Sequence, residues 1–519
     1  MAPANPPYDV VLAGFGPTGA TLATLLGRAG HRVRVVEREA EVYRLPRAVH
    51  FDHEVMRIFQ SAGVAEAVLP HTAPISDYRF LNSERELLLG GDIGGPSSDQ
   101  GWEVDYMFHQ PSLERELRDA AEALPSVEVG YGGELAGVET RDDGAVAIVR
   151  GPEGEERIEA RFVVGADGAA SATRRAAGFE LEDLGFDEPW VVVDLLGAKG
   201  LPDYCVQLCD PARPTTLVPG AHGFYRFEFM LRPDEGPEMD RPANVRRLVS
   251  AWLDPDSVEI VRAAVYRFHA VIARQWARGP VAIAGDAAHQ TPPFLGQGMC
   301  AGIRDAANLA WKLDLLLGGR AGASLLDTYG SEREPHVRRF IDTAILLGRI
   351  ICTQDPEMAR VRDAQMLADA KSSKRVVPSL PDLGPGCLQG GRAQAVHPRV
   401  GRLAPQPFVR TGGGEARLDD VTGPGFRLVL RDARGWPDPE RLARLASLRG
   451  RALVWSDADG AAPEGGLHVR DAGGRASAFF DGHGIHAFLA RPDHVTFGVA
   501  KAPDDVTALL DDLEAALGR

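Results

Sequence analysis

Apolar residues form a short continuous run near the start of the chain and then recur at helical spacing. Residues 8–13 are a mostly apolar run that ends at a glycine turn, which predicts a buried strand. Residues 17–29 have the pattern of a buried helix, and residues 32–37 predict a second strand. A strand, a helix and a strand in this order predict a βαβ unit that begins a doubly wound, Rossmann-like α/β sheet.

The middle of the chain changes to a β pattern and then returns. Residues 128–164 alternate apolar and polar positions between Gly and Asp turns, as antiparallel strands do. Residues 186–275 are rich in strand patterns and predict a separate β-rich domain. An apolar strand at 281–284 and a long helix at 299–317 lead back to the first domain. We therefore expect a discontinuous nucleotide-binding domain, residues 1–185 and 276–372, interrupted by the β-rich domain.

The C-terminal part has its own pattern. Residues 373–399 are rich in Pro and Gly and are interpreted as a linker. Residues 400–519 contain strand patterns at 426–430 and 452–455 and a final helix at 506–517. This length is sufficient for a third, small domain.

Composition narrows the class of protein. The chain has 519 residues and a formal net charge of −16, which disfavours nucleic-acid binding because that function needs a basic surface. The five cysteines are few, odd in number and without CxxC spacing, so we expect a cytoplasmic protein. Residues 10–27 carry no charge, but no Lys or Arg precedes them and they contain Pro17 and several glycines. We interpret them as a strand, a turn and a helix, and expect no membrane segment.

A glycine motif lies in the turn after the first predicted strand: Gly14-Phe15-Gly16-Pro17-Thr18-Gly19. Glycines there permit a tight turn and let the backbone approach a pyrophosphate at the N-terminus of the following helix. Glu37 ends the second predicted strand, where a carboxylate can bind ribose hydroxyls. The motif predicts dinucleotide binding but does not separate NAD from FAD.

Two further motifs follow apolar strands, where ligands bind in α/β sheets. The first is Gly165-Ala166-Asp167-Gly168. The second is Gly285-Asp286-Ala287-Ala288-His289, followed by Pro292-Pro293 and Gly296-Gln297-Gly298. The Pro-Pro and Gly-Gln-Gly segments before a helix indicate a rigid loop whose backbone contacts a ligand.

Together, the three motifs resemble those of the flavin-dependent aromatic hydroxylases, the p-hydroxybenzoate hydroxylase-like monooxygenases. The resemblance covers about residues 8–345 and includes Arg47 and Gln110. Within the family, the stretches 47–52, 209–214, 226–230 and 302–313 resemble the 3-(3-hydroxyphenyl)propionate hydroxylase group. The resemblance implies bound FAD, NADH or NADPH as a transient electron donor, and transfer of oxygen from O₂ to a phenol through a flavin hydroperoxide. A hydroxylase of an aromatic polyketide or another secondary metabolite is the alternative.

The resemblance and the motifs together indicate the site residues. Those expected to bind FAD are Gly14, Gly16, Pro17, Thr18, Gly19, Glu37, Arg38, Arg47, Gln110, Asp167, Asp286, Gly296, Gln297, Gly298 and Met299. Arg213 and Arg226 are candidates to bind a substrate carboxylate, because a guanidinium pairs with it in bidentate fashion. The candidates to polarise the phenol are His50, Tyr225 and His289. Pro293 belongs to the loop expected to face the flavin, and we expect no metal site.

Two features set this chain apart within the resemblance. Cys300 stands where many members carry Asn, beside the expected flavin. The last domain resembles the thioredoxin-like domain of larger members, yet no cysteine lies beyond Cys387, which excludes dithiol chemistry there. We expect a structural or assembly role for it, and a homodimer is the assembly left open.

Competing functions are disfavoured by particular motifs. A dehydrogenase that uses only a nicotinamide would not need the Gly-Asp and Gly-Gln-Gly segments. A flavin halogenase is disfavoured because the seven tryptophans include no Trp-x-Trp pair. A Baeyer–Villiger enzyme with two fingerprints is disfavoured because only one GxGxxG occurs. A binding protein without catalysis is the remaining alternative.

Overall fold

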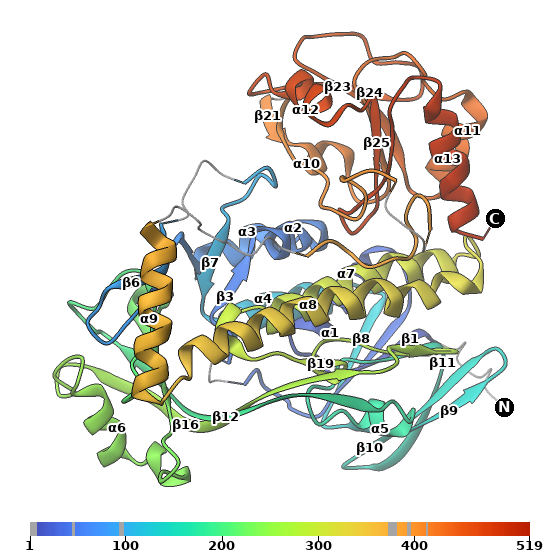
Figure 1. The fold of residues 1–519 in the computed structure, drawn as a ribbon. Coiled ribbons are helices and arrows are strands. Elements are labelled where there is room, and N and C mark those ends of the chain that lie inside the picture. The colour runs from blue at the N-terminus through green and yellow to red at the C-terminus, as the bar shows by residue number, and fades with distance from the viewer. Residues whose placement is uncertain are drawn as a thin grey trace.

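The computed structural model describes residues 8–43, 47–92, 98–371, 381–391, 396–411 and 414–518 (Figure 1). Five parallel strands form the centre of the first domain, in the order β18-β11-β1-β2-β8. They are β1 (Tyr8–Ala13), β2 (Val33–Glu37), β8 (Val127–Tyr131), β11 (Gly154–Gly165) and β18 (Val281–Ile283). The neighbouring strands β1 and β2 are connected by α1 (Pro17–Arg28), which confirms the predicted βαβ unit.

Helices cover this sheet and bury its apolar strands. The helix α7 (Gly298–Leu317) is buried along almost its whole length and packs against α1. Next to it runs α8 (Asp327–Ile351), the long helix across the middle of Figure 1, which the sequence pattern did not predict. Gly330 and Pro335 lie inside α8 and have low helix propensity, so the local sequence does not indicate a helix there. The helix nevertheless continues through both residues.

The remaining elements of the first domain are short. A hairpin of β9 (Glu134–Arg141) and β10 (Gly144–Gly151) extends β11, as the alternating pattern predicted. A small antiparallel sheet contains β3 (His50–Asp52), β7 (Asp105–Phe108) and β4 (Thr72–Ile75). The other elements are β17 (Ala277–Arg278) and the helices α2 (His53–Ala62), α3 (Ala65–Val68), α4 (Gln110–Glu122), α5 (Ala172–Ala176) and α9 (Pro356–Lys371).

The second domain is an eight-stranded sheet in the order β19-β16-β12-β15-β14-β13-β5-β6. Its strands are β5 (Asp77–Leu81), β6 (Leu87–Asp92), β12 (Leu181–Leu196), β13 (Cys205–Leu208), β14 (Thr215–Pro219), β15 (Phe224–Met230), β16 (Glu259–Ala273) and β19 (His289–Gln290). Residues 77–92 and the short strand β19 therefore complete a sheet that the sequence pattern placed within residues 186–275. Parallel pairing of β13 with β5 brings residues 77–92 there, a contact between distant segments that no local pattern encodes.

The two faces of this sheet are chemically different. Side chains alternate along β15, so Phe227 and Phe229 belong to an apolar core that also contains Val245 of α6 (Pro242–Val249). The opposite face carries Arg226 and Glu228 and lies against the first domain. We call this second face the inner face.

The C-terminal domain contains a seven-stranded sheet in the order β21-β20-β24-β23-β22-β25-β26. Its strands are β20 (Phe408–Thr411), β21 (Gly414–Arg417), β22 (Arg427–Leu430), β23 (Arg451–Ser456), β24 (Leu467–Asp471), β25 (Ala487–Ala490) and β26 (Thr496–Ala500). Its helices are α10 (Leu418–Thr422), α11 (Pro439–Ser447), α12 (Ala476–His483) and α13 (Asp505–Ala516). The three elements expected at 426–430, 452–455 and 506–517 are all present, within one or two residues at their ends.

Candidate active site

The glycines of the first motif have different structural roles. Gly14 has φ +95°, and a Cβ there would lie 2.3 Å from the Ala166 carbonyl oxygen. A Cβ on Gly19 would lie 2.1 Å from the Gly14 carbonyl oxygen. Both glycines are thus required for the packing of the loop itself. A Cβ on Gly16 would meet nothing within 4 Å, so this backbone is open to a ligand.

Side chains from two elements hold the glycine loop in place. Glu37, at the end of β2, accepts a hydrogen bond from the Phe15 N–H at 2.7 Å. Arg118 of α4 donates to the Phe15 carbonyl oxygen at 3.0 Å and is ion-paired with Glu114 at 2.8 Å. The sequence alone does not predict this role of Arg118, because Arg118 and Phe15 are 103 residues apart in the chain.

Two helices begin beside each other at this loop. Neither the N-cap of α1, Gly16, nor that of α7, Gln297, makes a side-chain capping bond. Thr18 joins the two ends, since a Cβ on Gly285 or on Gly302 would lie 2.7 or 2.3 Å from its Oγ1. The uncapped N–H groups and both helix dipoles favour an anionic group there. This pair of helix ends fits the pyrophosphate of a dinucleotide such as FAD.

Gln110 organises the segment that contains Arg47. Its Oε1 accepts hydrogen bonds from the N–H groups of Arg47, at 2.6 Å, and Ala48, at 2.7 Å. The Arg47 side chain is exposed and lies over the Tyr43 ring, with Cζ 5.5 Å from its centroid. Pro46, the residue before Arg47, lies outside the described residues. Gln110 therefore contributes to the site by positioning backbone.

The remaining acidic and basic candidates of the cofactor set have different environments. The Asp167 carboxylate accepts the Thr173 N–H and hydroxyl, both at 2.9 Å, at the start of α5, whose N-cap is Ser171. Asp286 follows β18 and its side chain is exposed. Arg38 is ion-paired with Glu39 at 3.2 Å on the surface.

The loop before α7 presents its backbone to the site and its glutamine to the interior. Gln297 donates to Asp52 at 3.1 Å and accepts from Arg304 at 2.9 Å. Arg304 is also paired with both Asp52 and Glu54. Pro293, Gly298 and Met299 are half-buried in the same segment. The side chain of Gln297 thus anchors the loop, and the network that holds it was not predicted.

His50 joins this loop to the small sheet. Its Nε2 lies 2.9 Å from Asp105 Oδ1, and its Nδ1 lies 3.3 Å from the Gly296 carbonyl oxygen. Burial alone would lower the pKa of His50, but its hydrogen bonds and the Asp105 charge raise the pKa well above its usual value. Cys300 is fully buried beside it, with Sγ 3.6 Å from the Gly296 oxygen. His50 is consequently a group that positions the loop.

The two arginines expected to bind a substrate carboxylate already have acidic partners. Arg213 forms two hydrogen bonds with Glu235, at 2.5 and 2.7 Å. Arg226 forms a bidentate pair with Asp194, at 2.7 and 3.0 Å, and donates to the Arg47 carbonyl oxygen at 2.5 Å. Arg226 thereby connects the inner face to the segment that contains Arg47, while Arg213 lies in the connection between β13 and β14.

Two other catalytic candidates are placed away from the inner face. Tyr225 alternates with Arg226 along β15 and packs with the apolar core on the opposite face. His289 is 1% exposed, bonded to Asp305 at 2.7 Å and stacked on Trp276 with centroids 5.2 Å apart. Strand alternation places Tyr225 on the face opposite Arg226, and burial between Trp276 and Asp305 encloses His289.

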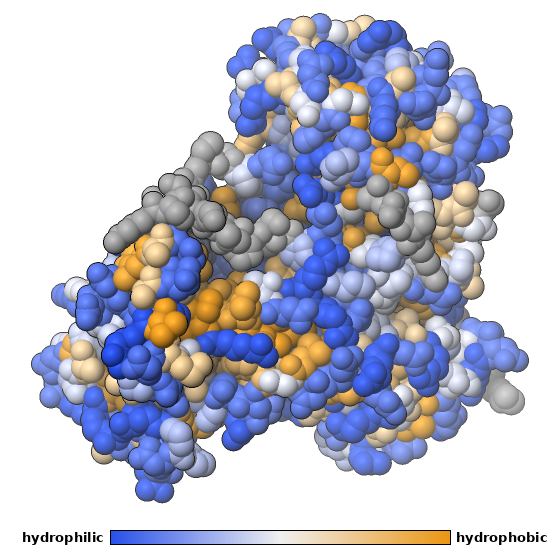
Figure 2. Space-filling view, viewed as in Figure 1, coloured by the Kyte–Doolittle hydropathy of each residue, from blue (hydrophilic) through white to orange (hydrophobic). Residues whose placement is uncertain are grey.

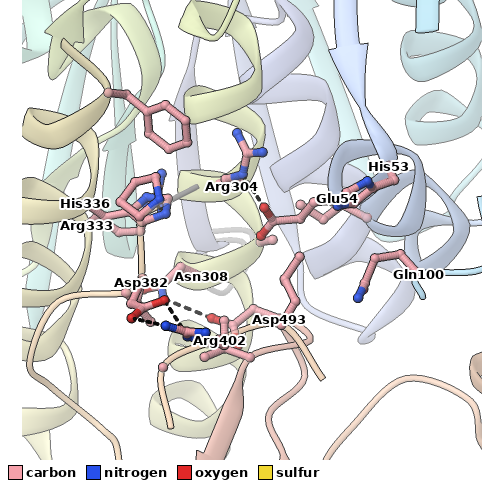
Figure 3. A pocket seen from close by; sticks show the side chains of 18 of the residues that line it. His53, Glu54, Gln100, Arg304, Asn308, Arg333, His336, Asp382, Arg402 and Asp493 are labelled. Atoms are coloured by element: carbon pink, nitrogen blue, oxygen red, sulfur yellow. Dashed lines mark hydrogen bonds and ion pairs between the residues drawn. The ribbon is translucent and has the colours of Figure 1, made fainter. Parts of the chain in front are cut away.

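A separate cavity of about 240 Å³ lies between the first and C-terminal domains (Figure 3). Its charged side chains are largely paired within the protein, Arg304 with Glu54 and Arg402 with Asp382 at 2.9 Å. Asn308 donates to Asp493 at 2.9 Å in the same wall. None of the residues expected to bind FAD is among those that line this cavity.

Within the described part of the chain, no three His, Cys, Asp or Glu side chains gather as metal ligands would. Among the same residues, no helix is both long and apolar enough to cross a membrane.

Comparison with known proteins adds to this geometry. The family model described as FAD binding domain matches residues 7–344, and the model described as HcaD C-terminal domain matches residues 401–516. A relative from Rhodococcus jostii, "Probable NADH-specific resorcinol 4-hydroxylase", is 40% identical over 98% of this chain and 95% of its own length.

Two further similarities extend over nearly the whole chain. The "3-(3-hydroxy-phenyl)propionate/3-hydroxycinnamic acid hydroxylase" of Mycolicibacterium smegmatis is 36% identical over 98% of this chain and 94% of its own. The crystal structure of aklavinone-11 hydroxylase with FAD and aklavinone is 26% identical, with a TM-score of 0.79 over 99% of this chain and 100% of its own.

Proposed function

This chain belongs to the FAD-binding-domain family, with aromatic hydroxylases as relatives, and from this premise we propose that it is an FAD-dependent monooxygenase of a small phenol. The observation that carries the proposal is the meeting of two uncapped helix ends, at Gly16 and Gln297, beside a sheet whose inner face carries Arg226 and Glu228. A dinucleotide site next to such a face suits a flavin enzyme with a separate substrate wall.

The residues present fit FAD. Backbone at Gly16 and Gly298, each open to a ligand, would hold the pyrophosphate, and Glu37 is at the position for a ribose. When bound, FAD reduced by a nicotinamide supplies the chemistry that places one atom of O₂ on an aromatic ring. The protein must orient that ring, exclude water and stabilise the ionised phenol. A phenol near pKa 10 must be shifted by about 3 pKa units, roughly 4 kcal/mol, to ionise near neutrality.

The names of the relatives suggest the substrate class and the electron donor. Resorcinol and 3-(3-hydroxyphenyl)propionate share a phenol with a substituent in the meta position, and we propose a meta-substituted phenol here. NADH is proposed as donor because one relative is named NADH-specific. A polyketide substrate is the second candidate, favoured by the similarity to aklavinone-11 hydroxylase.

The test is reduction of the purified flavoprotein by NADH in a stopped-flow instrument with a panel of phenols. We expect a meta-substituted phenol to accelerate flavin reduction and to gain one ¹⁸O atom from ¹⁸O₂. If no phenol does either, the proposed function fails. If only a polycyclic phenol does, the polyketide alternative replaces it.

We propose that the C-terminal domain has a thioredoxin-like fold without redox function. In support, its central parallel strands β22, β23 and β24 are flanked by antiparallel β25 and β26 and by helices. No cysteine occurs beyond Cys387. We therefore propose an assembly or stabilising role for this domain. A chain truncated before it should fold in lower yield, while the fraction that folds should keep its rate of flavin reduction.

A homodimer in the cytoplasm is the proposed assembly and location. Exposed apolar side chains gather where α8 and α9 meet, among them Leu346, Met358 and Val361 at 59%, 65% and 65% exposure (Figure 2). Such a patch is typical of a protein contact surface. All five cysteines are free thiols, as a reducing compartment requires. Light scattering of wild-type chain and Leu346→Glu tests the dimer.

A further inference from the structure

Glu228 occupies the middle of the inner face. Its register partners are Thr216 on β14 and Val192 on β12, and Arg226 and Met230 flank it along β15. This face is directed at the first domain, because Trp190, on the same face, packs on Phe294 with centroids 5.7 Å apart. Phe294 belongs to the loop before α7, which borders the flavin site. Glu228 is therefore on the wall opposite that loop.

The Glu228 carboxyl is buried without a partner of its own. The residue is 7% exposed, and among the described residues none makes a hydrogen bond or an ion pair with its carboxylate. Its charged neighbours are Arg226, Asp194 on β12 and Arg262 on β16, and Asp194 already pairs with both arginines. Burial, opposed by Arg226 and reinforced by Asp194, raises the pKa of Glu228 to about 7. A buried carboxyl group without a hydrogen-bond partner is a candidate to accept a hydrogen bond from a ligand.

We propose that Glu228 accepts a hydrogen bond from a ring hydroxyl of the substrate and makes the pocket select uncharged phenols over those with a carboxylate chain. This inference rests on the proposed function. A carboxylate accepts from a phenol O–H but repels another carboxylate in the same cavity. The predicted counter-ions, Arg213 and Arg226, are already paired with Glu235 and Asp194. An uncharged dihydroxybenzene of the resorcinol kind satisfies Glu228, and an aryl propionate does not.

The first experiment compares two ligands on the wild-type holoenzyme. Dissociation constants for 3-(3-hydroxyphenyl)propionate and for its uncharged analogue 3-(3-hydroxyphenyl)propan-1-ol are measured at pH 8 by calorimetry and by perturbation of flavin absorbance. The alcohol should bind at least tenfold more tightly. Equal or tighter binding of the propionate overturns the inference, and this outcome does not depend on the folding of any variant.

The second experiment compares Glu228→Gln with Glu259→Gln, a control at an exposed position on β16. Glu228→Gln should weaken resorcinol binding about tenfold and reduce the preference for the alcohol, while Glu259→Gln changes neither. An unchanged preference in Glu228→Gln overturns the inference. If wild-type enzyme hydroxylates phenols while this preference is absent, only the Glu228 inference fails. If it hydroxylates no phenol, the proposed function itself fails.

Discussion

Arg57 of α2 and Asp419 of α10 form a bidentate ion pair across the boundary between the first and C-terminal domains. Arg57 Nε lies 2.7 Å from Asp419 Oδ2, and Nη2 lies 3.1 Å from Oδ1. Arg427 adds a third contact, with Nη1 3.0 Å from the same carboxylate. All three side chains are buried, so the C-terminal domain is docked on the first domain through a desolvated charge cluster.

Removal of the Asp419 charge should destabilise the whole chain. Asp419→Asn leaves two guanidinium groups buried without their counter-charge, which costs about 3–5 kcal/mol. Urea unfolding followed by far-UV dichroism should show this loss. Asp420→Asn, at the exposed neighbouring position, is the control and should change stability by less than about 1 kcal/mol. Equal effects of the two changes would contradict the buried-cluster account.

A second buried cluster predicts a loss of stability in acid. Glu332 is fully buried, 2.8 Å from Lys312 Nζ and 2.9 Å from Arg491 Nη2. Burial opposes ionisation, but Arg491 and Lys312 outweigh it and lower the pKa of Glu332 to about 2. A carboxyl with a lowered folded pKa stabilises the protein above its unfolded value, about 4.3, and this stabilisation is lost as pH falls towards about 2. Thermal midpoints should fall across this window, and less steeply in Glu332→Gln.

Gly16→Ala should separate cofactor binding from folding. The added Cβ meets no protein atom within 4 Å, and Gly16 has φ −71°, which Ala adopts readily. We expect the apoprotein to keep its melting temperature and its dissociation constant for FAD to rise at least tenfold, measured by flavin fluorescence. Gly482→Ala, equally open but in α12, is the matched control. If Gly16→Ala keeps full FAD affinity, the pyrophosphate is not at this loop.

Arg213 and Arg226 should behave differently when replaced by Ala. Arg213 is paired with Glu235 away from the inner face, so its loss should lower stability and leave KM for the phenol within about threefold. Arg226 also holds the Arg47 carbonyl oxygen, so its loss should weaken FAD binding as well. Steady-state kinetics and FAD titration of both variants distinguish these outcomes. A large rise in KM for Arg213→Ala alone would restore it as a substrate ligand.

Local patterns accounted for much of the fold. The run 8–13, the glycine turn and the helix after it appear at β1 and α1 with nearly the expected ends. These segments are predictable because strand burial, glycine turns and helix starts depend on neighbours a few residues away. The helix α8 was not predicted because Gly330 and Pro335 weaken its local signal, and packing against residues 293–295 and α7 compensates.

The candidate site was only partly predictable for the same reason. The Gly-rich motif indicated a dinucleotide, and its backbone role needs no distant partner. Tyr225, His289 and Arg213 were chosen by residue type, and their roles depend on strand parity, burial and the position of Glu235. Glu228 was overlooked because a Glu inside a strand pattern looks solvent-exposed until a second domain covers that face.

The sequence by itself determined the flavin-binding segments and the class of chemistry, since both are contained in contiguous motifs. Only the tertiary structure decided which polar side chains lie on the inner face and which are already paired within the protein. Pairing of β13 with β5, docking of the inner face on the loop before α7, and the prior pairing of each arginine with an acid are contacts between distant segments. Their energies arise from burial and charge compensation, which exist only once the chain has folded.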